Sequence, residues 1–134
     1  MTDYQRYAVY YAPKADSDLA AFGNAWLGRD PETGREMDRP AAIGLADGEV
    51  AAITVSPSRY GFHGTLKPPF ALKDGQTRVQ LERAIADYCA TASSVTCGPL
   101  LLKSIGSFIA LIPTAPTDPL GALASGLVQA LDGF

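Results

Sequence analysis

The spacing of hydrophobic and polar residues in the first part of the chain predicts a strand followed by a helix. Residues 6–12, RYAVYYA, are rich in aromatic and β-branched side chains, which favour a strand. Apolar residues then recur at helical spacing, and either Asp16 or Ser17 is suited to cap that helix. Phe22 and Trp26 fall on its apolar stripe. We therefore expect both rings to be buried against a sheet.

The later pattern predicts a strand, a helix, a hairpin and a final helix. Residues 60–72 alternate between their two faces as a strand does, and Thr77 caps the helix that follows. Two apolar runs, 99–104 and 107–113, flank an Ile-Gly pair that is typical of a hairpin turn. Within the second run, residues 108–112 are apolar on both faces, so we expect this strand to be central. Thr117 then caps a helix with a leucine stripe.

Together, the predicted elements indicate the α+β fold class, with the order β-α-β-α-β-β-α. We expect residues 1–134 to form a single domain. Residues 28–42 are dense in charge, proline and glycine, which favours a solvated loop, although its charges could also contact a ligand. Residues 52–58 are interpreted as a short extended segment. Helices alternate with strands and one connection is tight. We therefore expect a mixed or antiparallel sheet with helices packed on one face.

Composition and charge narrow the class of protein. The 134 residues are 47% hydrophobic and 19% charged with a net charge of −3, which is typical of a globular domain and gives no broad basic face for nucleic acid. No apolar run approaches the roughly 20 residues of a membrane span, and the N-terminus lacks the pattern of a signal peptide. We expect a cytoplasmic protein. Its two cysteines, Cys89 and Cys97, are expected to be buried or half-buried free thiols.

The chemistry-bearing stretch is RYGFHGTLKPPF, which holds the only histidine, His63. In a strand, Thr65 and Lys67 would share a face with His63, so that a proton carrier, a hydroxyl donor and a cation lie in a row. This arrangement suits a phosphate ester. Tyr60 is a candidate to stack on a ligand. The spacing equally fits a strand-end histidine bonded to backbone or water, a solvated lysine and a packed tyrosine.

Other catalytic motifs are absent from the sequence. It contains no G-x-x-x-x-G-K phosphate loop, no G-x-G-x-x-G and no G-x-S-x-G elbow. No carboxylates cluster near His63 in the sequence, and one histidine with two distant cysteines makes no metal-ligand pattern. We therefore predict neither a metal nor a cofactor.

A longer set of residues resembles one known family. The segments RYAVYYAP, FGNAWLGRDPETG and RYGFHGTLKPPFAL together resemble the 2H phosphoesterase superfamily, in the uncharacterised branch encoded near phosphonate-utilisation genes. That superfamily is similar to the LigT-like RNA 2′,3′-cyclic phosphodiesterases. The resemblance implies two pseudo-symmetric α+β lobes around a cleft, each giving one H-x-T/S motif. One histidine of such a pair acts as a general base and the other as a general acid.

Carried over to this chain, the resemblance implies that His63 is one of two proton carriers and that Thr65 holds the phosphate. Lys67 and Tyr60 would then bind the substrate. The resemblance implies that the partner is a small phosphate ester or a cyclic nucleotide. Because this branch is encoded near phosphonate-utilisation genes, a ribose cyclic phosphate from phosphonate breakdown is one such ligand. We do not expect membranes or nucleic acid in general to be partners, whereas the ends of RNA stay an open alternative as ligands.

The chain departs from the family pattern because it holds one histidine and not two. We expect it to be the N-terminal, LigT-like lobe with the opening of the second lobe, and to be nearly inactive alone. Two alternatives stay open. One is a phosphate-ester or nucleotide binding module without catalysis. The other is a homodimer, formed over exposed apolar surface, in which two copies of His63 share a cleft.

Overall fold

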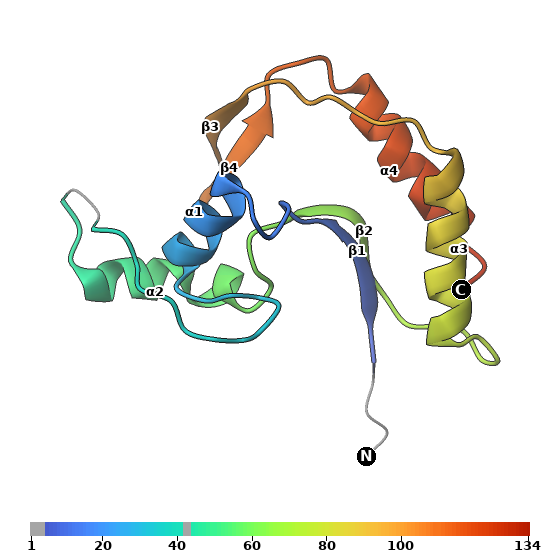
Figure 1. The fold of residues 1–134 in the computed structure, drawn as a ribbon, viewed down its shortest axis with the longest axis horizontal. Helices are drawn as coiled ribbons and strands as arrows, with labels where there is room; N and C mark the ends of the chain where they lie inside the picture. The colour runs from blue at the N-terminus through green and yellow to red at the C-terminus, as the bar shows by residue number, and fades with distance from the viewer. Residues whose placement is uncertain (1–4, 42–43) are drawn as a thin grey trace. The chain divides into compact units, whose positions relative to one another are not determined.

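A computed structural model describes residues 5–41 and 44–134, which have an α+β fold (Figure 1). The described elements, in chain order, are β1 (Tyr7–Tyr11), α1 (Asp18–Leu27), α2 (Asp47–Ser58), β2 (Gly64–Phe70), α3 (Arg78–Thr91), β3 (Leu100–Ile105), β4 (Phe108–Pro113) and α4 (Asp118–Ala130). The expected order therefore lacked one helix, α2. In place of one sheet, the described residues form two two-stranded sheets, β1 with β2 and β3 with β4.

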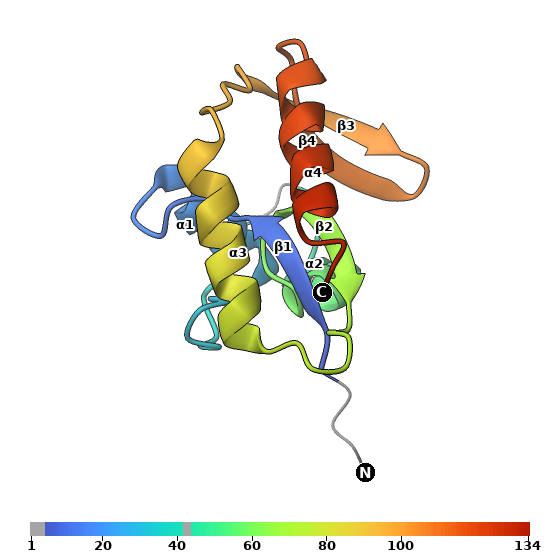
Figure 2. The same cartoon turned by 90° about the vertical axis from the view of Figure 1, so that its right-hand side faces the viewer.

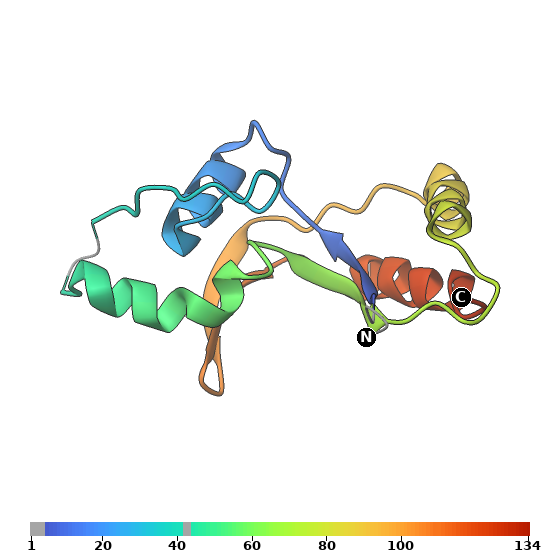
Figure 3. The same cartoon turned by 90° about the horizontal axis from the view of Figure 1, so that it is seen from below.

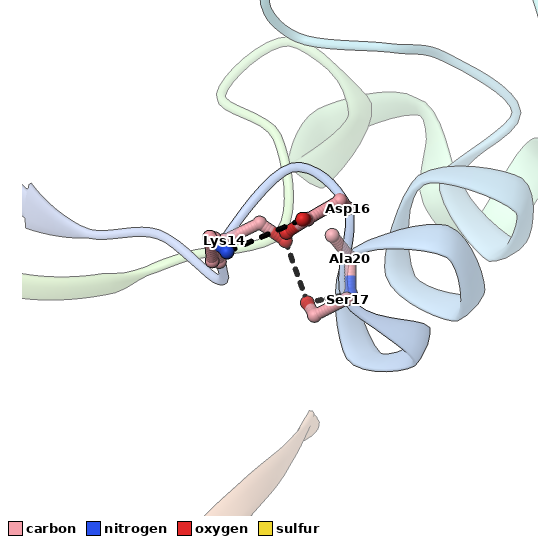
Figure 4. A network of polar contacts seen from close by, with 4 residues as sticks. All are labelled: Lys14, Asp16, Ser17 and Ala20. Carbon is pink, nitrogen blue, oxygen red and sulfur yellow. Dashed lines mark hydrogen bonds and ion pairs between the residues drawn. The ribbon is translucent and has the colours of Figure 1, made fainter.

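Contacts divide the chain into two compact units, one of residues 10–65 and the other of residues 66–134 with the segment before Tyr10. The first unit contains α1 and α2, which lie side by side (Figure 3). Ser17 caps α1, since its Oγ accepts a hydrogen bond from the Ala20 N–H at 3.2 Å and donates one to the Lys14 carbonyl at 2.6 Å. Asp16 instead pairs with the Lys14 ammonium (Figure 4).

The helix α2 replaces the extended segment expected at 52–58, so that expectation is wrong. The helix begins after Ala46, whose N–H donates to the Glu49 carboxylate at 2.8 Å. Val50 and Thr54, one turn apart, are both buried. The Thr54 hydroxyl donates to the Val50 carbonyl at 2.7 Å, and Arg39 donates to the same hydroxyl at 3.3 Å. Burial of one face and internal bonding of the threonine outweigh the strand preference of β-branched residues.

The expected burial of Phe22 on α1 is also wrong, because its side chain is 54% exposed. Trp26 is half-buried, while Ala20, Gly23 and Leu27 make the buried face of α1. Gly23 and Leu27 belong to the stripe expected from the sequence, whereas Phe22 lies outside the buried face. The helix therefore packs through its small residues, and Phe62 contacts it at Gly23, where any side chain would overlap the ring.

The second unit is built around α3 and α4, which lie side by side (Figure 2). Thr77 caps α3 as expected, in a reciprocal pair with Gln80. Leu127 and Leu131 from α4 and its C-terminal end meet Leu81 from α3 in the core, which confirms the expected leucine stripe.

The hairpin of β3 and β4 confirms the expected turn but corrects the place of its second strand. The strands pair antiparallel, with Ile105 opposite Phe108 at the turn. In the structure β4 is hydrogen-bonded to β3 alone among the described strands, and Phe108 and Ile109 are 62% and 67% exposed. It is therefore not a central strand within the described residues, and the hairpin presents apolar side chains on both faces.

Two further expectations concern single features. Both cysteines are free, but Cys89 is exposed where burial was expected, whereas Cys97 is half-buried. No helix in the described part of the chain has the length and apolar character needed to cross a membrane.

Candidate active site

The backbone at the end of α2 positions His63. The N–H groups of Tyr60 and Gly61 both donate to the Pro57 carbonyl, at 3.1 Å, and Gly61 has a φ of 79°. A Cβ at Gly61 would lie 2.7 Å from the Cβ of Pro31, so both the conformation and the space require glycine. The turn brings the Gly61 carbonyl within 2.8 Å of His63 Nδ1. A carbonyl only accepts, so Nδ1 carries the proton and the neutral ring has its free lone pair at Nε2.

Two tyrosine rings lie near the imidazole. Tyr10, in β1, stacks on His63 with ring centroids 3.8 Å apart and planes tilted by 24°. Because His63 directly precedes β2, the pairing of β1 with β2 accounts for this contact. The ring centroids of Tyr60 and His63 lie 6.5 Å apart, and the two ring planes are tilted by 52°. The hydrogen bond and the stack together hold the ring in one orientation.

These residues line a pocket of about 270 Å³ that lies within the 10–65 unit. Its polar and aromatic lining comes from β1, α1, the loop after α1 and the segment before β2. That lining consists of Tyr10, Asn24, Asp30, Glu32, Tyr60 and His63. Alanines, prolines and Phe62 complete the wall, and no lysine or arginine of the described part of the chain belongs to it. The pocket therefore places an imidazole beside aromatic faces and carboxylates.

The acidic wall of the pocket is a tight turn. The Asp30 carboxylate accepts hydrogen bonds from the Thr33 hydroxyl at 2.8 Å and from the Glu32 N–H at 2.9 Å. The bond from the Thr33 hydroxyl, followed by that from the Glu32 N–H, lowers the pKa of the Asp30 carboxyl below its ordinary value. Asp30 is thus an ionised residue that fixes the turn, and Glu32 extends from it.

Of the four site residues expected from the sequence, the pocket brings together His63 and Tyr60. Thr65 is exposed in β2 and is not part of the pocket lining. Lys67 belongs to the other unit, is only 9% exposed and has its Nζ 4.6 Å from the centroid of the Phe70 ring. A cation–π contact of this kind competes with an anion for the ammonium.

Sequence reasoning missed Tyr10 as a site residue and left Glu32 as one charge among many in a loop. The alternation in residues 6–12 indicates a strand but not which of its tyrosines meets the histidine. The stack depends on the pairing of β1 with β2, which local spacing does not reveal. In the described residues, no three His, Cys, Asp or Glu side chains gather in a group that could hold a metal ion.

Comparison with known families gives a match to the second half of the chain. The family model described as "Protein of unknown function (DUF1045)" matches residues 65–134. The match covers β2 through α4 and therefore more than half of the chain, but it begins two residues after His63.

Two curated relatives match nearly the whole chain. One, from Janthinobacterium sp. (strain Marseille), is 32% identical over 127 residues, which cover 95% of this chain and 28% of the relative. The other, from Laribacter hongkongensis (strain HLHK9), is 36% identical over 132 residues, which cover 96% of this chain and 30% of the relative. Both are named "Ribose 1,5-bisphosphate phosphokinase PhnN". The chain thus spans less than a third of either relative. No solved structure matches it.

Proposed function

This chain belongs to the DUF1045 family, and we propose that it supplies His63 as a proton carrier in a 2H-type phosphoesterase that opens a cyclic phosphodiester. The fixed imidazole is the observation that carries the proposal. Its Nδ1 is bonded to the Gly61 carbonyl, and Nε2 has no hydrogen-bond partner among the described residues. An imidazole held in this way presents one basic nitrogen, which can accept a proton from a water molecule.

The proposed reaction is the hydrolysis of one P–O bond. Nε2 removes a proton from a water molecule as its oxygen attacks phosphorus, and the bond from phosphorus to one ester oxygen breaks. The released alkoxide takes a proton from a second carrier, and His63 passes its proton to solvent. We propose that the Thr65 hydroxyl donates a hydrogen bond to a phosphate oxygen and that Tyr60 binds the substrate.

The 134 residues hold one histidine, so the second proton carrier comes from outside them. A second copy of the chain is our proposal for its source, because it would bring a second His63. Loss of one acid or base lowers a rate by about 10²–10⁴, so a lone chain is expected to be slow. The rate per chain should therefore rise with chain concentration, and a rate per chain that stays constant would exclude the shared site.

The proposed substrate is a ribose cyclic phosphate or a nucleoside 2′,3′-cyclic phosphate, free or at an RNA end, and phosphonate breakdown is the proposed source of the first. The reaction named for the two relatives uses ribose 1,5-bisphosphate. Opening a cyclic phosphate on ribose also yields a ribose phosphate, which supports this class. We do not propose the kinase reaction for this chain, because its sequence has no G-x-x-x-x-G-K phosphate loop.

The test is the conversion of a nucleoside 2′,3′-cyclic phosphate to its monoester, followed by phosphorus NMR at high chain concentration. We expect His63→Ala to lower the rate at least about 100-fold. Glu36→Gln is the matched control, because its exposed side chain lies in the same unit outside the pocket lining. Wild-type hydrolysis that survives His63→Ala would overturn the proposal.

A binding module without catalysis is the second candidate, favoured by the single histidine. It predicts that the chain binds the cyclic ester and releases no product. Calorimetry with the same ester distinguishes the two, because the module requires binding at millimolar ligand and the absence of binding would exclude it.

A further inference from the structure

The pocket beside His63 is unsuited to phosphate. Among the described residues, its lining contains the carboxylates of Asp30 and Glu32 and no lysine or arginine side chain. Phosphate groups in proteins are bound by arginine, lysine and N–H donors, and like charges that face one another are repulsive. The part of a phosphate ester that enters this pocket must therefore be its uncharged part.

Two polar side chains in the lining have hydrogen-bonding capacity left over. The Asp30 carboxylate is engaged by its own turn. In contrast, no hydrogen bond within the described residues involves the Glu32 carboxylate or the Asn24 side-chain amide. A carboxylate accepts from hydroxyl groups, and an amide both accepts and donates. Together they match the hydroxyls of a sugar.

The aromatic part of the lining fits the same kind of ligand. Tyr10 and Tyr60 both line the pocket, and the ring of each lies near the imidazole of His63. Tyrosine offers a rigid apolar face with a hydroxyl at its tip, which suits a ring that is apolar on its faces and polar at its rim. At about 270 Å³ the pocket lies just below the usual range of small-molecule sites, about 300–1,000 Å³. One ring fits and an oligonucleotide does not.

We propose that this pocket is a sugar subsite, in which Glu32 and Asn24 bind the hydroxyls of a single sugar ring and the phosphate stays outside, at the edge marked by His63. The position of the phosphate rests on the function proposed above, whereas the sugar subsite rests on the lining alone. Glu32 is then a specificity residue, since it selects for hydroxyls and against a second phosphate group within the pocket.

The test is an NMR titration of the 134-residue chain with two ligands, methyl β-D-ribofuranoside and inorganic phosphate. We expect the riboside to shift the ring signals of Tyr10 and Tyr60. Glu32→Ala should weaken its binding roughly tenfold, as expected for loss of a hydrogen bond to a charged group. Glu36→Ala, in the same loop and outside the pocket lining, should leave it unchanged. Phosphate affinity should not fall in Glu32→Ala.

Several results would overturn the sugar subsite. They are riboside binding that Glu32→Ala leaves intact, phosphate that shifts the Asn24 amide as strongly as the riboside does, and a riboside that shifts neither tyrosine. Asn24→Ala is a second variant on a different element and should also weaken the riboside. The proposed hydrolysis fails on a different measurement, the effect of His63→Ala on turnover, so the two failures are distinguishable.

Discussion

The turn at Gly61 makes the sharpest prediction, because one backbone position controls both stability and the state of the imidazole. Alanine at Gly61 must adopt a φ near 79°, which costs an L-residue about 1–2 kcal/mol. Its Cβ would also lie 2.7 Å from the Pro31 Cβ, and forced overlap of this kind costs about 1–3 kcal/mol. We therefore expect Gly61→Ala to destabilise the protein by roughly 2–5 kcal/mol.

Gly34 provides a matched control in the same unit. Its φ is 73°, but the nearest heavy atom to an added Cβ is Arg29 Nη2 at an ordinary 3.6 Å. Gly34→Ala should therefore lower the free energy of unfolding only by the cost of the left-handed conformation, about 1–2 kcal/mol. Urea unfolding measures both variants, since a change in midpoint at constant slope reports stability. Equal losses for the two variants would refute the assigned contact with Pro31.

The same substitution should change the protonation pattern of His63. In the wild type, the 2.8 Å bond to the Gly61 carbonyl favours the proton on Nδ1 by about 0.5–1.5 kcal/mol, which is roughly a two- to twelvefold preference. Nitrogen NMR of the neutral ring reads this ratio without ambiguity, because the chain has one histidine. We expect Gly61→Ala to move the population towards Nε2–H. A wild-type ring that already carries its proton on Nε2 would refute the geometry.

Two other predictions concern the turn at Asp30 and the cap of α3. The lowered pKa of the Asp30 carboxyl means that its contribution to stability is present above the ordinary value of 3.8 and is lost as the pH falls through the lower folded value. The difference in urea midpoint between wild type and Asp30→Ala should therefore shrink on acidification, and a constant difference would contradict the assignment. Thr77→Ala should cost about 1 kcal/mol through loss of the cap on the Gln80 N–H, with Thr91→Ala, at the far end of α3, as the comparison. An equal loss in Thr91→Ala measured by thermal unfolding would argue against the cap.

Local signals in the sequence were sufficient for most elements of the second unit. The Thr77 cap, the turn after Ile105 and the leucines of α4 all depend on residues within a few positions of one another. Hydrogen bonds at a helix start and apolar repeats at helical spacing are local features, so a single sequence records them.

Features that depend on packing between elements were not predictable in this way. The β-branched run of Ile53, Thr54 and Val55 favours a strand, yet the buried Thr54 bonds to Val50 inside α2 and accepts from Arg39. The donor Arg39 lies 15 residues away and its guanidinium also bonds to the Leu27 carbonyl at 3.0 Å. A helix stabilised by such distant groups is invisible to a pattern of neighbours.

In the candidate site too, local spacing predicts some features and packing between elements decides the others. From the sequence, His63 is a candidate because it would share a strand face with Thr65 and Lys67. In the structure, however, Lys67 is buried with its ammonium over the Phe70 ring. What singles out His63 in the structure is the combination of a backbone acceptor at Nδ1, a tyrosine ring whose centroid lies 3.8 Å from its own, and a pocket whose described lining has no lysine or arginine. A merely structural histidine needs the first two. The pocket is the feature that a structural role leaves unexplained, so ligand binding there is the property on which a functional assignment of this residue depends.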